Sequence, residues 1–312
     1  MAKDWHETFT SWAKPPTETE EAKGSLAATT ISAAVRESPA LANRKFEVYP
    51  TGSYRNNTNV KLASDIDVAI VLTEAVYYQL PPTGSPTLAE IGLTDVTYGL
   101  VEFRNDVAKA LEAKFGVKGV TAGEKAFNVH ETSTRLDADA AVFLEYRRYT
   151  GAKNPDGTWV YLSGAEMRPS GNPTLRVINW HRQHYAEGIA RNDATKRRFK
   201  RITRILKRLR DDMRENGTTE VKAAALPIPS FLLECLVFNA PDTCFNLVEG
   251  SYFEDVKAIV VAQYDATKDD SSCASFVEVS RLKPLFANGQ PWRRAAVHAF
   301  LLQAWKHVGF VK

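Results

Sequence analysis

An apolar run that opens with two aspartates constrains this chain more than any other feature. Ile66 to Leu72 is almost entirely Ile, Val, Leu and Ala, which predicts a buried strand. Asp65 and Asp67 stand at its entrance, so both side chains leave the same face of the strand. Two like charges at the edge of a core repel each other unless a cation lies between them. Their oxygen ligands suit Mg²⁺, or alternatively Mn²⁺. The alternative interpretation is an edge hairpin with two solvated aspartates. It is disfavoured because the rest of the strand is apolar.

A Gly-Ser pair precedes these aspartates. Gly52 and Ser53 follow the alternating segment Phe46 to Tyr49, which predicts another strand. Glycine lets the backbone approach a ligand closely, and serine offers a hydroxyl and an amide that can bind anionic oxygens. The two strands would therefore bring phosphate donors and metal ligands to the same crevice.

This pattern resembles a known signature. Gly52-Ser53, eleven further residues and then Asp65-x-Asp67 are similar to the motif of the DNA polymerase β-like nucleotidyltransferases. The longer form, TGSYRNNT followed by SDIDV, looks most like the cGAS/DncV-like (CD-NTase) branch. That branch contains the cyclic-oligonucleotide synthases of bacterial antiphage (CBASS) systems, and animal cyclic GMP-AMP synthase and oligoadenylate synthase are its relatives. The resemblance extends from Glu20 to Trp305 and is most specific at the Gly-Ser pair and the two aspartates.

A third acidic ligand is expected on a neighbouring strand, because two metal ions in a phosphoryl-transfer site need more ligands than two side chains supply. Asp137 and Asp139 are the candidates, and both lie on one face of an apolar segment that continues to Tyr146. In the resembled family the third aspartate directly precedes a short apolar run, commonly Asp-Val-Val-Pro. Asp139 fits this place better than Asp137, although Val142 stands where the family has proline.

The most basic segment, Lys196 to Arg210, predicts an amphipathic helix. Lys200, Arg204 and Lys207 lie on the side opposite an apolar stripe. The stripe consists of Phe199, Ile202, Ile205, Leu206, Leu209 and Met213. A lysine on the polar side can balance triphosphate charge; the alternative is a solvated charged face. FKRITRILKRLR resembles the family helix whose lysine contacts the donor phosphates, which makes Lys200, ahead of Lys207, the candidate.

Ser230 is a further phosphate-binding candidate. The segment PSFLLE, which contains it, resembles the start of the following family helix, whose serine also reaches the donor phosphates. Without the resemblance, Ser230 is simply a residue suited to the N-cap of a helix.

The remaining pattern predicts an α+β protein of two lobes. Thr17-x-x-Glu20 is a capping box that opens a helix over 17–36, and Arg147 to Leu162 forms a hairpin around the turn at 154–157. Further expected elements are a helix at 97–115, edge strands within 117–130, and helices at 173–190, 193–215, 228–239, 252–266 and 291–308.

These elements suggest two domains. By the resemblance, residues 1–165 would form a polymerase β-like catalytic lobe with a mixed β-sheet and an N-terminal helix that spans both lobes. Residues 166–312 would form a helical lobe similar to the C-terminal part of oligoadenylate synthase. The active site would lie in the cleft between them, where ligand sites are common.

Composition narrows the function classes. The net charge of +3, from 40 basic and 37 acidic side chains, does not indicate a protein that coats nucleic acid, so no obligatory nucleic acid is expected. No apolar run approaches the roughly 20 residues of a membrane span. Three cysteines without CxxC spacing argue against a disulfide framework or a zinc site. We expect a cytoplasmic protein with reduced thiols and no membrane partner.

Together with the resemblance, these residues imply an enzyme. It would join nucleoside triphosphates (ATP, GTP or UTP) into a cyclic di- or trinucleotide second messenger and release pyrophosphate, acting as a monomer in antiphage signalling. A downstream effector would bind the product rather than the enzyme. Catalysis and metal binding would fall to Asp65, Asp67 and Asp139. The donor phosphates would be bound by Gly52, Ser53, Lys200 or Lys207, and Ser230.

Two other functions stay open. A transferase that extends RNA or makes linear oligonucleotides would need a second basic tract to bind the nucleic acid, and none is evident in the sequence. A catalytically silent module that binds nucleotide or RNA is disfavoured because three carboxylates are intact. The bases, the linkage and the ring size are not fixed by these patterns.

Overall fold

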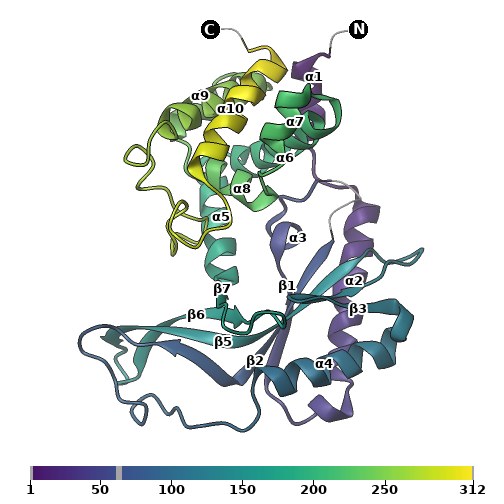
Figure 1. Cartoon of the computed structure of the whole chain (residues 1–312), viewed down its shortest axis with the longest axis vertical. Coiled ribbons are helices and arrows are strands. Elements are labelled where there is room, and N and C mark those ends of the chain that lie inside the picture. The colour runs from purple at the N-terminus through teal and green to yellow at the C-terminus, as the bar shows by residue number, and fades with distance from the viewer. Residues whose placement is uncertain (1–2, 61–64, 311–312) are drawn as a thin grey trace. The chain divides into compact units, whose positions relative to one another are not determined.

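The computed structural model describes residues 3–60 and 65–310. Contacts within the chain divide it into two compact units, both drawn in Figure 1. The sheet unit comprises Thr17–Arg55 and Ala63–Arg182, and the helical unit comprises Met1–Pro16, Asn56–Leu62 and Gln183–Lys312. The boundary predicted at 165 and 166 falls within the strand Trp159–Met167. The segment between the Gly-Ser pair and the first aspartate thus belongs largely to the helical unit.

A mixed sheet forms the centre of the sheet unit. Its strands among the described residues are β1 (Phe46–Pro50), β2 (Ile66–Gln79), β3 (Val120–Ala122), β4 (Ala126–Val129), β5 (Ala138–Lys153), β6 (Trp159–Met167) and β7 (Val177–Asn179). The order is β1-β2-β5-β4-β3, with β6 joining β5 to β7. β2 and β5 are parallel, and the other pairs are antiparallel. The predicted strands, and the hairpin of β5 and β6, are confirmed.

Helices cover one face of this sheet. The helices of the sheet unit are α2 (Glu18–Arg36), the short α3 (Gly52–Asn56) and α4 (Leu100–Phe115). The predicted capping box is present, because Thr17 and Glu20 each accept a hydrogen bond from the other's backbone N–H. Buried Val68, Ile70 and Leu72 of β2 pack with residues of α2 and α4 into one core cluster. Burial of alternate residues on β2 therefore holds this strand against the helices.

The opposite face of the sheet carries a smaller apolar cluster. Ala69, Val71 and Phe143 are buried there with two residues of β6. Asp67 lies an even number of residues from Ala69 and Val71 on β2, and Asp139 lies an even number from Phe143 on β5. Alternate residues of a strand share a face, so both aspartates lie on the face of this cluster.

The helical unit is built from α1 (Trp5–Trp12), most of α5 (His181–Ala194), α6 (Arg198–Asn216), α7 (Thr219–Ala225), α8 (Ser230–Phe238), α9 (Phe253–Ala266) and α10 (Arg294–Val308). The helix predicted at 173–190 is wrong in its first part. Val177–Asn179 is the edge strand β7, and the helix begins only at His181. The β-branched Val177 and Ile178 pair with β6, which outweighs the helical spacing. The short helix α7 was not predicted from the pattern.

Helix α6 runs through the core of the helical unit. All six residues of its predicted apolar stripe are at most 1% exposed. The polar side is not solvated as a whole, however, because Arg204 is 4% exposed and Lys207 is 2% exposed. A solvated face is therefore wrong for these two residues.

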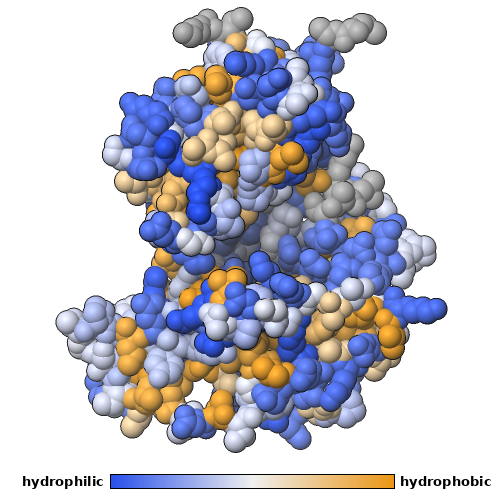
Figure 2. All heavy atoms as spheres, in the orientation of Figure 1, coloured by the Kyte–Doolittle hydropathy of each residue, from blue (hydrophilic) through white to orange (hydrophobic). Residues whose placement is uncertain are grey.

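Hydrophilic residues predominate on the face shown in Figure 2, where hydrophobic residues form separate areas. Within the described residues, no single helix has the length and apolarity that a membrane crossing requires. In the part of the chain that the structure describes, one bent pair of helices, α7 and α8 at 80°, meets those criteria by length and composition.

Candidate active site

The parallel pairing of β2 and β5 brings two predicted site residues side by side. Asp67 is the register partner of Asp139, and neighbouring strands lie about 4.8 Å apart. Asp65 precedes Asp67 by two residues and leaves the same face of the chain. Burial raises the pKa of Asp65, and repulsion from Asp139 and Asp137 raises it further. The ionised form of Asp65 is therefore disfavoured unless a cation lies beside it.

The two candidates for the third carboxylate have different surroundings. Asp137 accepts a hydrogen bond from the backbone N–H of Glu131 at 2.7 Å, and the ring of His130 is 4.0 Å away. Asp139 accepts one hydrogen bond, from the side-chain amide of Asn128 at 3.3 Å. Asp137 thus fastens the loop before β5, whereas Asp139 lies beside Asp67.

The Gly-Ser pair lies directly against Asp67. Gly52 has a φ of +63°, and a Cβ added there would stand 1.8 Å from Oδ2 of Asp67. The backbone N–H of Thr51 donates to the carbonyl oxygen of Asp67 at 2.8 Å. Any side chain at residue 52 would therefore displace the Asp67 carboxylate. Ser53 follows Gly52 in the short helix α3.

Lys207 is engaged in a buried network of the helical unit. Its ammonium donates to the carbonyl and hydroxyl oxygens of Thr58, at 2.9 and 3.1 Å, and to Glu234 at 3.3 Å. His184 contacts the other oxygen of Glu234 at 2.9 Å. Burial raises the pKa of Glu234, but the charges of Lys207 and His184 outweigh it and hold that pKa at about 2. The network ties the segment after the Gly-Ser pair to α6 and α8.

Sequence reasoning named Lys207 without its partners. Glu234 was present in the PSFLLE segment and could have been recognised as a counter-charge, since a buried lysine needs one. Thr58 gave no signal, because only the folded chain brings it to α6.

The other two helical-unit candidates are differently placed. Lys200 is half-buried, and no hydrogen bond or ion pair to its ammonium is found among the described residues. Burial lowers its pKa, whereas the charge of Glu234 acts to raise it. The hydroxyl of Ser230 accepts from Arg210 at 3.0 Å. Pro229, not Ser230, occupies the N-cap of α8, so simple capping does not explain this serine.

The carboxylates suit a divalent cation by their chemistry. Asp65, Asp67 and Asp139 offer hard oxygen donors, and the raised pKa of Asp65, caused by burial and by repulsion from Asp139 and Asp137, favours a cation beside it. In the described ranges no group of three or more acidic, histidine or cysteine side chains is already gathered closely enough to hold a metal. A cation would therefore have to draw the three carboxylates together.

Comparisons with known proteins identify the family to which the chain belongs. A family model described as cGAS/DncV-like nucleotidyltransferase C-terminal helical domain matches residues 186–309, and one described as nucleotidyltransferase domain matches residues 31–125. The cyclic dipyrimidine nucleotide synthase CdnE of Legionella pneumophila is 38% identical over 310 residues, or 99% of each chain. The chain belongs to the cGAS/DncV-like nucleotidyltransferases. The CdnE of Cecembia lonarensis, also a cyclic dipyrimidine nucleotide synthase, is 34% identical over 99% of this chain and 100% of the relative.

Solved structures of the family share the fold. The CdnE cyclic dinucleotide synthase of Elizabethkingia meningoseptica, solved with GTP and Apcpp, has a TM-score of 0.78 and 27% identity, and covers 99% of this chain and 100% of that one. The c-UMP-AMP synthase CdnE of Rhodothermus marinus, solved with Apcpp and Upnpp, has a TM-score of 0.79 and 25% identity over 99% of both chains. The predicted polymerase β-like fold and the predicted nucleotidyltransferase activity are confirmed.

Proposed function

We propose that this nucleotidyltransferase joins two pyrimidine nucleoside triphosphates into a cyclic dinucleotide and releases pyrophosphate. The observation that carries the chemistry is the pairing of Asp67 with Asp139 on adjacent strands, with Gly52 held against Asp67. The choice of pyrimidines is supported by the two cyclic dipyrimidine nucleotide synthases that are 38% and 34% identical. A relative that is 29% identical is a cyclic dipurine nucleotide synthase, so purine and pyrimidine triphosphates are both offered in the test of this function.

Asp65, Asp67 and Asp139 would hold Mg²⁺, or Mn²⁺ in its place. Such an ion lowers the pKa of an attacking ribose hydroxyl and neutralises charge on the leaving pyrophosphate. Because Gly52 has no side chain, it leaves room for the Asp67 carboxylate. The hydrogen bond from the backbone N–H of Thr51 to Asp67 fixes the start of the Gly-Ser turn to β2. Ser53 offers its hydroxyl and amide to the phosphates. These residues orient the nucleotide beside the carboxylates, which is how positioning lowers a barrier.

Lys200, together with Ser230, serves the donor phosphates in this proposal. The Lys200 ammonium is not held by any ion pair among the described residues, so it can meet a phosphate without first losing a partner. Lys207 differs, because Thr58 and Glu234 already surround its ammonium. Lys207 is therefore assigned to holding Thr58, in the segment that follows the Gly-Ser pair.

The cellular setting completes the proposal. The enzyme acts as a monomer in the cytoplasm, where thiols such as those of its three free cysteines stay reduced. Its product serves as a second messenger in antiphage signalling of the CBASS type, and an effector binds that product rather than the enzyme.

Incubation with labelled ATP, GTP, CTP and UTP in the presence of Mg²⁺, followed by chromatography, tests this function. We expect a cyclic product that contains pyrimidines and resists phosphatase. Asp67→Asn should abolish it while the protein stays folded. A ladder of linear products would instead support an oligonucleotide-extending transferase. The absence of any product from the folded enzyme, with each nucleotide supplied, would support a silent nucleotide-binding module.

A further inference from the structure

A side-chain amide contacts the third carboxylate from the strand on its other side. Asn128 of β4 is the register partner of Asp139 of β5, and Asp139 is in turn the register partner of Asp67 of β2. Because register partners share a face of the sheet, the three side chains form one row across it. The amide of Asn128 donates to Oδ1 of Asp139 at 3.3 Å. No step of the proposed reaction gives Asn128 a role.

The core fixes the register of this row. Phe127 and Val129, on either side of Asn128, are 4% and 0% exposed and belong to the apolar cluster formed with α2 and α4. Both pair with buried alanines of β5. Since alternate residues of a strand leave opposite faces, Asn128 lies on the face that carries Asp139. A shift of one residue would bury the amide and expose both apolar side chains, so the packing of β4 enforces the contact.

The amide and the carboxylate are committed to each other. Among the described residues, neither the amide of Asn128 nor the carboxylate of Asp139 has a second hydrogen-bond partner. The polar groups nearby are paired elsewhere. The hydroxyl of Thr121 lies 2.8 Å from Nε2 of His130, and Asp137 accepts from a backbone N–H. The contact is therefore specific to this pair and does not belong to a general polar cluster.

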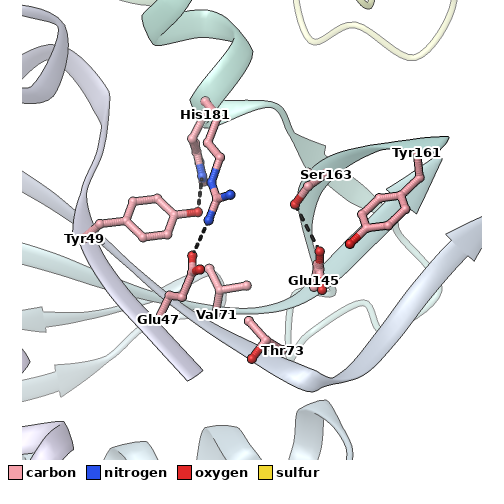
Figure 3. A pocket seen from close by; sticks show the side chains of 10 residues that line it. Glu47, Tyr49, Val71, Thr73, Glu145, Tyr161, Ser163 and His181 are labelled. Carbon is pink, nitrogen blue, oxygen red and sulfur yellow. Dashed lines mark hydrogen bonds and ion pairs between the residues drawn. The ribbon is translucent and has the colours of Figure 1, made fainter. Parts of the chain in front are cut away.

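Glu145, on the same face of β5, provides a contrast. It lines a polar pocket of about 280 Å³, which Figure 3 shows. The hydroxyl of Ser163 donates to Glu145 at 3.1 Å, and the guanidinium of Arg147 forms an ion pair with it at 2.8 Å. The charge of Glu145 is thus balanced within the protein. Asp139 has an uncharged donor and no ion pair among the described residues, so its charge stays available to a cation.

We propose that Asn128 is a positioning residue for metal binding: its amide fixes Oδ1 of Asp139 and leaves the rest of that carboxylate to a divalent cation. A carboxylate has about four acceptor positions, and the amide occupies one of them. Hydrogen bonds of this kind orient the ligands of metal sites, and their loss costs about 10- to 100-fold in metal affinity or activity. The inference rests on the proposed function, because it requires Asp139 to bind the metal.

Mn²⁺ binding to the full chain without nucleotide, measured from the EPR signal of the free ion, tests this role. Asn128→Leu keeps the approximate size of the side chain and removes the donor. We expect it to bind Mn²⁺ at least about tenfold more weakly than the unaltered chain does, and to raise the half-saturating Mg²⁺ concentration for pyrophosphate release by a similar factor. Asp139→Asn should also weaken Mn²⁺ binding. Adding Asn128→Leu to it should cause less than about twofold further loss, because the amide acts through Asp139.

Thr121→Val is the matched control. Thr121 is the register partner of Asn128 on β3, and its hydroxyl contacts His130 instead of Asp139. This variant should bind Mn²⁺ as the unaltered chain does. Thermal unfolding identifies folded variants, and Asn128→Ala replaces Asn128→Leu if the latter does not fold.

The outcomes separate this inference from the proposed function. Unchanged Mn²⁺ affinity in the folded Asn128 variant, together with weakened binding in Asp139→Asn, would overturn the role of Asn128 and leave the proposed function standing. Equal weakening in Thr121→Val would also overturn that role, because it would show a general effect on this edge of the sheet. Mn²⁺ affinity that Asp139→Asn does not alter would overturn the proposed metal site, and the role of Asn128 with it.

Discussion

Lys207→Met tests whether this lysine supports the fold or binds substrate. Of the partners that the described residues supply, the substitution leaves the buried Glu234 carboxylate the Thr58 hydroxyl and the His184 ring. Removing one member of a buried ion pair costs about 3–5 kcal/mol. The depressed pKa of Glu234, about 2 against an ordinary 4.5, corresponds to about 3 kcal/mol in total, to which Lys207 contributes together with His184 and Thr58. We therefore expect Lys207→Met to lower the free energy of unfolding by several kcal/mol.

Equilibrium urea unfolding, followed by tryptophan fluorescence, measures this loss. The double variant Lys207→Met with Glu234→Leu replaces the whole pair by apolar side chains, so it should recover much of the stability. Lys200→Met is the matched comparison, because it removes the same charge from the same helix. It should leave stability within about 0.5 kcal/mol and reduce pyrophosphate release at least tenfold. If Lys207→Met is fully stable but inactive while Lys200→Met is active, the two assignments are reversed and the reasoning fails.

Three further predictions concern the site and its support. Gly52→Ala should reduce pyrophosphate release at least about a hundredfold with the chain still folded, because the added Cβ occupies the place of the Asp67 carboxylate; near-normal turnover would contradict the close contact. Chelation of divalent cations should stop turnover, and Mg²⁺ or Mn²⁺ should restore it, whereas activity that survives exhaustive chelation would rule out the metal-binding role of the carboxylates. Because the folded-state pKa of Glu234 is depressed, its stabilisation is complete above pH 4.5 and declines as pH falls toward about 2; acid unfolding should therefore be less steep in Glu234→Gln, and an identical acid profile would contradict the pairing.

The local parts of the fold could be predicted from the sequence because their causes are local. The capping box at Thr17 and the apolar stripe of α6 depend on spacing within one element. The pairing of Asp67 with Asp139 follows from two apolar segments that each begin with an aspartate pattern, once they are parallel neighbours. The predicted roles of these residues stay predictions until variants are assayed.

The parts that were missed depend on distant partners. Lys207 is buried because Thr58 and Glu234 come to it from remote segments, and amphipathic spacing cannot show this. Val177 and Ile178 form a strand because the edge of β6 is available to them. The pocket beside Glu145 likewise combines four strands and the start of α5, and no single segment carries its pattern.

The most direct measurement of the central claim compares Asp139→Asn with Asp137→Asn. Both substitutions remove one charge from neighbouring positions of the same segment, but only Asp139 lies beside Asp67. We predict that Asp139→Asn lowers the rate of pyrophosphate release in Mg²⁺ at least about a thousandfold, as expected when a group that acts on the transition state is lost, while Asp137→Asn keeps most of the activity. Full activity in folded Asp139→Asn would contradict the account of the site.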